Sequence, residues 1–308
     1  MTLDADTVVA LDVGGSSLKG AVLDRAGTAL WTLQRRTRRE AGPDAVVETV
    51  LATLEELRAH PAARRARACG LVVPGIVDVA SGRAVWSENL KWRDVPFRTL
   101  TAERTGLPVA LGHDVRAGGL AEARTGAARG AGNVLFVPIG TGIGAAIVVD
   151  GRVLDGDGMA GELGHVDVGH REPCACGAVG CLESIASAAA IARRYAHRSG
   201  KQTLGASDVL KRMHDGDHIA REVWDEAVDA LSRGLATACS LVAPEVIIVG
   251  GGLATAGAEL IEPLSSRLQA RLTFQRQPRI VPAELGERAG CAGAGLLAWT
   301  LLDEGVAA

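Results

Sequence analysis

The sequence predicts an α/β protein of two units, each built from strands and helices around a glycine-rich turn. A buried strand at residues 7–13 runs into Gly14 and Gly15, and another at residues 133–139 runs into Gly140, so the same plan occurs twice. The 308 residues allow one large or two ordinary domains, and the 47% of apolar residues suffice for a sizeable core. We expect residues 1–114 and about 291–308 to form the smaller unit, and residues 115–290 the larger one.

In the first half of the chain, apolar runs bounded by turn residues predict strands, and apolar residues at helical spacing predict helices. The clearest helix follows Pro43, where Val47, Val50, Leu54 and Leu57 recur every three or four residues. The expected strands are residues 7–13, 19–24, 29–37, 66–73 and 108–111, and the expected helices are residues 44–59 and 97–105.

The second half repeats the strand pattern and then becomes mostly helical. A strand at residues 133–139 is interrupted by glycines and resumes at 145–149, and a short buried strand at 246–249 leads into three glycines. A further strand is expected at residues 279–282. The expected helices are residues 115–125, 187–198, 207–214, 219–242, 263–272 and 292–302.

Composition narrows the class of protein. The net charge of −3 gives no sign of a nucleic-acid surface, and the arginine cluster at residues 35–39 is typical of a solvated strand or loop. No apolar run reaches the roughly 18–20 residues that span a bilayer. The short acidic start of the chain is unlike a secretory leader, so we expect a cytoplasmic protein without a membrane partner.

One histidine and three cysteines stand close together in the second half: His165, Cys174, Cys176 and Cys181. A closed Cys₃His set suits tetrahedral zinc, and soft sulfur ligands argue against magnesium or calcium. The alternative is a disulfide pair, which a reducing compartment disfavours. The remaining cysteines, Cys69, Cys239 and Cys291, lie among small apolar residues and are expected to be buried.

Two glycine turns are candidate phosphate sites. Backbone amides in such a turn can form an anion-binding concavity, and the hydroxyls of Ser16, Ser17 and Thr141 add donors. Asp12, just before the first turn, could hold Mg²⁺. Taken alone, the first turn is more typical of an ordinary glycine hairpin, and it is the second turn that favours a phosphate site. Neither turn matches a Walker A loop or a dinucleotide fingerprint. The residues concerned are Asp12, Gly14, Gly15, Ser16, Ser17 and Lys19, then Gly140, Thr141, Gly142 and Gly144.

Two further segments have more than one interpretation. Gly250, Gly251 and Gly252 follow a buried strand, where they allow either close approach of a flat ligand such as adenine or a tight turn into a helix. Asp114 lies where a strand ends and a helix begins. Its carboxylate there is either a helix N-cap or a catalytic base, and spacing does not separate the two.

Together these segments resemble the ROK family of sugar kinases and related repressors, and most of all its zinc-containing, ATP-dependent bacterial glucokinases. The most specific match is residues 161–165 followed by the cysteine set and Leu182-Glu183. The other matching segments are residues 12–20, 74–78, 89–92 and 140–144.

The resemblance implies an actin-like ATPase (ribonuclease H-like) fold of two α/β domains around a central cleft. It implies ATP phosphates on the two glycine turns and adenosine near residues 250–252. It also implies that Asp114 accepts the proton of a sugar's primary hydroxyl, with Mg²⁺ and a structural Zn²⁺ as cofactors. The sugar would be held by Gly75, Asn89, His113, Glu162, His165 and Glu183.

The resemblance leaves the substrate and the assembly open. This chain has His113 before Asp114 where the family usually has asparagine, which puts glucose in doubt more than kinase activity. Glucose is the first expectation, and N-acetylmannosamine, mannose and fructose are alternatives. A repressor is disfavoured because no helix-turn-helix segment precedes the first strand, and a non-catalytic sugar-binding protein is a further alternative. The family suggests a homodimer or homotetramer.

Overall fold

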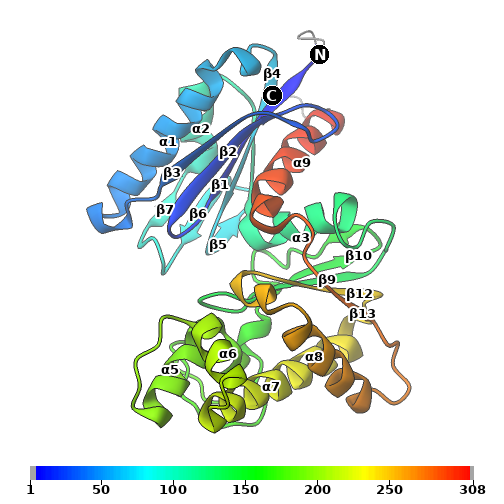
Figure 1. The fold of residues 1–308 in the computed structure, drawn as a ribbon. Coiled ribbons are helices and arrows are strands. Elements are labelled where there is room, and N and C mark those ends of the chain that lie inside the picture. The colour runs from blue at the N-terminus through cyan, green and yellow to red at the C-terminus, as the bar shows by residue number, and fades with distance from the viewer. Residues whose placement is uncertain (1–4, 306–308) are drawn as a thin grey trace. The chain divides into compact units, whose positions relative to one another are not determined.

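Two five-stranded sheets with the same strand order form the framework of the protein (Figure 1). In each sheet the chain first makes an antiparallel meander of three strands, and two further strands then add in parallel to the first strand of that meander. The repeat expected from the sequence is therefore confirmed. The first sheet has the order β3-β2-β1-β4-β8, with β1 Thr7–Val13, β2 Ser17–Leu23, β3 Ala29–Arg36, β4 Ala66–Val73 and β8 Val109–His113. The second has the order β11-β10-β9-β12-β13, with β9 Val134–Pro138, β10 Ala146–Val149, β11 Arg152–Val153, β12 Val246–Gly250 and β13 Arg279–Pro282.

The computed structural model describes residues 5–305, which fall into two units. Unit 1 contains the described residues up to Ala121, Asp155–Met159 and those from Glu287 onward, and unit 2 contains Glu122–Leu154 and Ala160–Gly286. The division falls inside the helix α3, Asp114–Thr125. Residues 1–4, which include most of the acidic start, and residues 306–308 of the expected C-terminal segment lie outside the described residues.

Alternation along β1 explains how unit 1 is layered. Val9 and Leu11 face the apolar side of helix α1, Pro43–Ala59, where they join a core with Val50 and Leu54. Val8 and Ala10 point to the opposite face and pack with helix α9, Ala289–Asp303. Because successive side chains of a strand point to opposite faces, the unbroken apolar run Val8–Leu11 indicates a sheet covered on both sides.

A small three-stranded sheet in unit 1 was not expected. The sheet consists of the antiparallel strands β5 Ile76–Asp78, β6 Arg83–Trp86 and β7 Arg93–Val95. In the chain these strands follow β4 and precede helix α2, Phe97–Thr105. Each strand has only three or four residues, which is too short for an alternating pattern to stand out. Buried Trp92 and Phe97 meet edge to face beside this sheet, with ring centroids 5.1 Å apart.

The core of unit 2 is built around one long helix, α7 His218–Val242, whose buried face carries Val223, Ala227, Leu231 and Leu235. Asp217 begins the helix by accepting hydrogen bonds from two backbone N–H groups of the first turn. Four shorter helices pack on α7: α4 Leu182–Ala186, α5 Ala188–Ser199, α6 Ala206–His214 and α8 Ala258–Arg271. No helix among residues 5–305 is long and apolar enough to cross a membrane.

The expected start of the next helix is wrong. Helix α8 runs over Ala258–Arg271, so Pro263 lies inside it and not at its beginning. A proline there has no N–H to donate to the carbonyl of Glu259, one turn earlier. The indole Nε1–H of Trp224 donates to that carbonyl oxygen at 3.3 Å. A hydrogen bond from the neighbouring helix thus satisfies the acceptor that the proline leaves open, which no local pattern could show.

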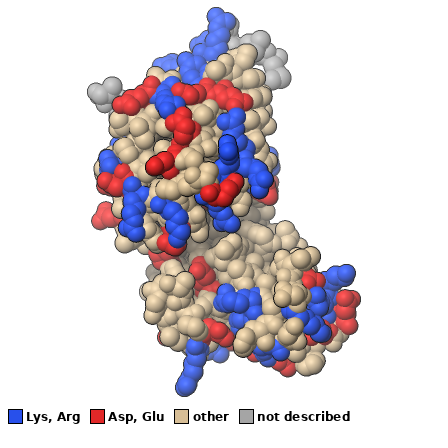
Figure 2. All heavy atoms as spheres, turned by 90° about the vertical axis from the view of Figure 1, so that its left-hand side faces the viewer, with Lys and Arg blue, Asp and Glu red and all other residues tan. Residues whose placement is uncertain are grey.

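The other expected strands and helices are confirmed within a few residues at their ends. Short 3₁₀ turns connect several of them, including η3 Leu163–His165, η4 Gly252–Ala256 and η5 Gly286–Arg288. On the face shown in Figure 2, basic and acidic side chains are interspersed, in keeping with a net charge near zero.

Candidate functional site

The first glycine turn joins β1 to β2 and is held from outside the turn. The N–H of Gly14 donates to the carbonyl of Ser17 at 3.0 Å, which closes the turn. Thr37, directly after β3, donates its hydroxyl to the carbonyl of Gly14 at 2.6 Å, and its N–H donates to the carbonyl of Ser16 at 3.1 Å. Thr37 is fully buried. This role of Thr37 was not expected, because the residue stands in an arginine cluster typical of a solvated segment.

Asp12 lies at the end of β1, in surroundings that disfavour its charge. Burial raises the pKa of Asp12 to about 7, the nearby carboxylate of Asp114 adds to the rise, and Lys19 opposes it. The first turn of α9 comes so close that a Cβ at Gly290 would lie 2.4 Å from Asp12 Oδ2. A carboxylate in this position beside a second carboxylate is one that a divalent cation would stabilise, so the residues present fit Mg²⁺. Lys19 itself pairs with Glu287 at 3.0 Å.

Asp114 is the first residue of α3, at the positive end of the helix dipole. Its Oδ1 accepts a hydrogen bond from the N–H of Val115 at 2.7 Å, and its side chain keeps 26% of its surface exposed. His113 provides the cap: its Nδ1 accepts the N–H of Arg116 at 3.4 Å and lies 3.4 Å from Asp114 Oδ1. The imidazole therefore takes the place that an asparagine side chain commonly takes at an N-cap. The N-cap role that the sequence allowed for Asp114 is therefore filled mainly by His113.

The two other candidate residues of unit 1 lie next to the small sheet. Gly75 connects β4 to β5 with a φ of 99°, and a Cβ there would lie 2.1 Å from the carbonyl oxygen of Trp86. Asn89 lies exposed in the turn between β6 and β7, which is closed by the N–H of Lys91 donating to the carbonyl of Ser87 at 2.8 Å.

The second glycine turn is held by a side chain that the sequence assigned to sugar. Oε2 of Glu183 accepts the N–H of Ile143 at 2.8 Å. A Cβ at Gly142 would lie 2.4 Å from the same oxygen, so a side chain there would displace the carboxylate. Within the turn, the N–H of Gly140 donates to the carbonyl of Gly142 at 2.9 Å, while Thr141 is exposed. The structure thus brings together Glu183 and the Gly140–Gly144 turn, which the sequence had treated as separate groups.

The glycines at the end of β12 lie beside Ile139, the residue that follows β9. The N–H of Ile139 donates to the carbonyl of Gly250 at 2.9 Å, and the N–H of Leu253 donates to the carbonyl of Ile139 at 3.0 Å. Gly250 is buried, whereas Gly251 and Gly252 are exposed and lead into η4. This segment therefore makes a tight turn, and it also leaves exposed backbone at the end of the sheet.

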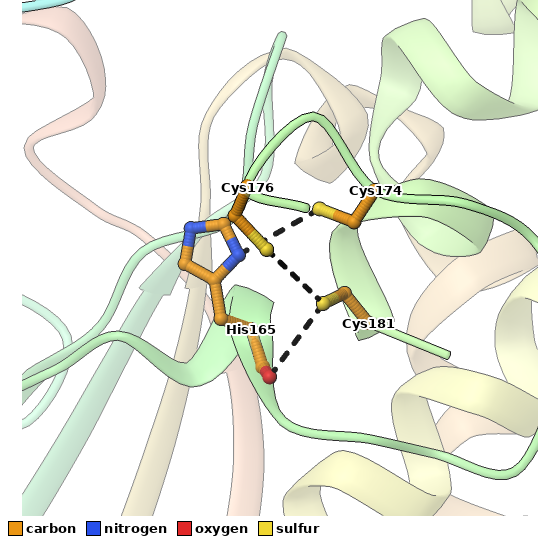
Figure 3. Close-up of side chains that lie close together, drawn as sticks. All are labelled: His165, Cys174, Cys176 and Cys181. Atoms are coloured by element: carbon orange, nitrogen blue, oxygen red, sulfur yellow. Dashed lines mark hydrogen bonds between the residues drawn. The ribbon is translucent and has the colours of Figure 1, made fainter. Parts of the chain in front are cut away.

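The four expected zinc ligands converge (Figure 3). Their ligand atoms all lie within 4.8 Å of one another, with Cys174 Sγ 3.8 Å from His165 Nδ1 and Cys176 Sγ 3.7 Å from Cys181 Sγ. Tetrahedral zinc with Zn–S bonds of about 2.3 Å separates its sulfur ligands by about 3.8 Å. A disulfide requires sulfurs about 2.05 Å apart. The geometry fits zinc, and all the cysteines are free thiols.

A metal ion at this cluster would have to displace protons from its thiols. Burial, together with the other cysteines of the set, raises the pKa of the Cys181 thiol to about 12. The Cys176 thiol accepts a hydrogen bond from the N–H of Ala178, which lowers its pKa to about 7. Zinc binds thiolates, so loading the cluster would release protons. We call residues 165–181 the zinc loop.

His165 presents its two ring nitrogens to different groups. Nδ1 faces the sulfurs, and Nε2 lies 3.9 Å from Oε2 of Glu162, whose side chain is 61% exposed. Cys181 immediately precedes α4, which carries Glu183. Glu162 and Glu183 therefore lie close to the cluster along the chain, three residues before His165 and two residues after Cys181.

Comparison with known proteins gives one family. A model described as the ROK family matches residues 8–300. A glucokinase from Halalkalibacterium halodurans is 33% identical over 94% of this chain and 94% of its own length. An N-acetyl-D-glucosamine kinase from Pectobacterium carotovorum is 31% identical, covering 93% of this chain and 97% of that protein.

Solved structures agree with this assignment. A ROK hexokinase from Thermus thermophilus has 33% identity and a TM-score of 0.86, and the match covers 97% of this chain and 100% of that one. A ROK family glucokinase from Streptomyces griseus, in complex with glucose and AMPPNP, has 26% identity and a TM-score of 0.81 over 96% and 99% of the two chains. The expected actin-like ATPase fold is confirmed.

Proposed function

The chain belongs to the ROK family, and we propose that it is an ATP-dependent kinase that phosphorylates the primary hydroxyl of a hexose, most favourably glucose. The observation that carries the proposal is the position of Asp114: a partly exposed carboxylate at a helix start, beside a second carboxylate, Asp12, that suits a cation. Phosphoryl transfer requires positioning and charge neutralisation more than covalent chemistry, and this arrangement supplies a base and a cation site.

In the proposed reaction, Asp114 accepts the proton from the sugar's primary hydroxyl while that oxygen bonds to the γ-phosphorus and the bond to ADP breaks. The amides and hydroxyls of the two glycine turns would bind the phosphates of ATP, and residues 250–252 would lie along the adenosine. Mg²⁺, held by Asp12, would neutralise phosphate charge.

The sugar would be held by hydrogen bonds to Gly75, Asn89, Glu162, Glu183 and Nε2 of His165. Ionised carboxylates such as those of Glu162 and Glu183 accept hydrogen bonds from hydroxyls. Zinc bound to the Cys₃His set has no open position for substrate, so its role would be to fix the side chains of Glu162, His165 and Glu183.

A coupled ADP-release assay tests the proposal. The acceptors are glucose, mannose, N-acetylmannosamine, N-acetylglucosamine and fructose, each at saturating Mg-ATP, and we expect glucose to give the highest kcat/KM. Turnover confined to another of these sugars would support the kinase activity but identify a different substrate. If no sugar is turned over but glucose binds by calorimetry, the chain is instead a non-catalytic sugar-binding protein.

His113 is the residue we expect to set the substrate range. It caps α3 and touches Asp114, and it is bulkier than the asparagine usual in the family. His113→Asn restores that residue while keeping an N-cap acceptor. We expect the ratio of kcat/KM between glucose and the other sugars to change, with the fold unaltered. An unchanged ratio would show that the difference at this position does not determine the sugar.

A further inference from the structure

A cavity of about 650 Å³ lies in unit 2, apart from every residue assigned above to sugar, nucleotide or metal. Its walls are residues 168–172 of the zinc loop, Ile185 of α4, Arg194 of α5 and one face of α7. The volume lies in the range typical of small-molecule sites. The proposed kinase reaction gives this cavity no task.

Most of the acidic groups of the cavity are already matched by positive charge. Three carboxylates project from α7, and each pairs with at least one arginine: Asp225 with Arg267, Glu226 with Arg194 and Arg198, and Asp229 with Arg233 and Arg271. A cation would therefore find little unpaired negative charge in this wall.

Arg194 has an unused donor. Its side chain is only 8% exposed, Nη2 pairs with Glu226, and Nη1 donates to the carbonyl of Ile185 at 3.4 Å. Its Nε finds no hydrogen-bond acceptor among residues 5–305, and the carboxylate of Glu172 is 3.9 Å away, beyond hydrogen-bonding reach. A buried guanidinium N–H without an acceptor is unfavourable, so an oxygen brought to this wall would stabilise it.

Arg171 adds positive charge to the rim of the cavity. Its side chain is exposed, and within residues 5–305 no ion pair involves it. A guanidinium presents a planar fork of donors that matches the oxygens of a phosphate or a carboxylate. Glu172, which is about half-exposed, is the nearby acceptor for hydroxyl groups.

We propose that this cavity binds a small hydroxylated oxyanion, a phosphate or carboxylate carried on a short polyol. The anionic group pairs with Arg171 and supplies the acceptor that the Arg194 side chain lacks, and the hydroxyls donate to Glu172. This site is separate from the proposed active site and does not depend on the kinase assignment.

Two contacts connect the cavity to the zinc loop and α4. The N–H of Glu172 donates to Nδ1 of His170 at 3.0 Å, so Nε2 carries the ring proton and donates to the carbonyl of Cys181 at 3.0 Å. Arg194 donates to the carbonyl of Ile185, two residues after Glu183. A ligand in the cavity therefore stabilises the segment that carries a zinc ligand and a proposed sugar ligand.

Isothermal titration calorimetry on the full chain, with its metal content measured, tests the proposal without turnover. The probes are 3-phosphoglycerate, inorganic phosphate and glycerol, at constant ionic strength and without sugar or nucleotide. We expect 3-phosphoglycerate to bind once per chain, phosphate alone to bind more weakly and glycerol not to bind. Arg171→Ala, at an exposed position where folding is not at risk, weakens 3-phosphoglycerate about tenfold. Arg152→Ala, an exposed arginine on β11 outside the cavity, leaves it unchanged.

Hydrogen exchange gives a second readout in the same proteins. Amides of residues 182–186 should exchange more slowly with 3-phosphoglycerate bound to the wild type, and this protection should be lost in Arg171→Ala. The proposal is overturned if no probe binds up to ~10 mM. It is also overturned if Arg171→Ala binds as tightly as the wild type, because the anion then lies elsewhere, for example on a glycine turn.

Discussion

The two glycine turns occupy the same place in two sheets of the same strand order, but different side chains hold them. In unit 1 the turn is held by Thr37, a neutral residue whose hydroxyl donates a hydrogen bond to the carbonyl of Gly14. In unit 2 the corresponding turn is held by Glu183 of α4, whose carboxylate accepts a hydrogen bond from the N–H of Ile143. Only the second turn is therefore connected directly to the segment that carries the zinc ligands.

The segments that follow the last strand of each sheet also differ between the two units. In unit 1, β8 ends in His113 and leads into Asp114 at a helix start. In unit 2, β13 ends in Pro282, and the N–H groups of Glu284 and Leu285 just beyond it donate to the buried carboxylate of Glu122. The shared framework positions the turns, whereas the added loops decide which unit carries the proposed catalytic carboxylate and which carries the Cys₃His set.

The largest expected effect concerns the end of β8. Asp114→Asn should lower kcat by roughly 10²–10⁴-fold, because an amide cannot take the proton of the sugar hydroxyl. The Kd for glucose, measured by calorimetry, should change little. Asp44→Asn, an exposed acid in the first turn of α1, is the matched control and should behave as the wild type. Near-normal turnover of Asp114→Asn would remove unit 1 as the source of the base.

The next largest expected effect concerns the Cys₃His set of unit 2. Cys176→Ser should lose zinc and weaken glucose binding by about tenfold or more, since the proposed sugar ligand His165 belongs to the cluster and Glu162 and Glu183 adjoin it in the chain. Metal analysis and calorimetry on the same preparation measure both quantities. Cys239→Ala, a buried cysteine outside the cluster, should keep its zinc. A wild-type protein that contains no zinc would reject the link between metal and sugar.

Local patterns in the sequence were sufficient to predict the long strands and helices and the Cys₃His set. Long apolar strands and helices such as β1, α1 and α7 were predicted because their periodicity extends over seven residues or more. The zinc ligands were predicted because all four fall within 17 residues, where spacing and chemistry are both visible.

Contacts between distant residues could not be predicted in this way. Glu183 meets Ile143 across 40 residues, Thr37 meets Gly14 across 23, and Trp224 reaches the carbonyl of Glu259 across 35. Each is a single side-chain hydrogen bond that depends on how the elements pack. A sequence pattern shows which residue can form a bond, but only the fold shows which partner it finds.

A smaller effect concerns the pH dependence of stability. Because the pKa of Asp12 is raised to about 7 in the folded protein, the folded state holds a proton that the unfolded state has lost between about pH 4 and 7. The free energy of unfolding therefore falls as pH rises through this range, by up to about 1.4 kcal/mol per unit from this group. Asp12→Asn removes that contribution.

Urea unfolding of the metal-free protein at pH 5 and pH 8 measures the difference between Asp12→Asn and the wild type. We expect the variant to gain stability relative to the wild type at pH 8 and to gain much less at pH 5. Added Mg²⁺ should reduce the gap at pH 8, since the cation favours the ionised carboxylate. A gap that does not depend on pH would mean that Asp12 is not protonated near neutrality.

The smallest effects test how the two turns are held. Thr37→Val removes the hydroxyl that donates to Gly14 and should lower the free energy of unfolding by about 1 kcal/mol. Glu183→Gln keeps an oxygen that can accept the N–H of Ile143, so its stability should stay close to that of the wild type, whereas Glu183→Ala should lose about 1 kcal/mol or more. Urea unfolding resolves these differences. If Gln is as destabilising as Ala at this position, the charge of Glu183 holds the turn of unit 2, and the two turns then differ in electrostatics as well as in partner.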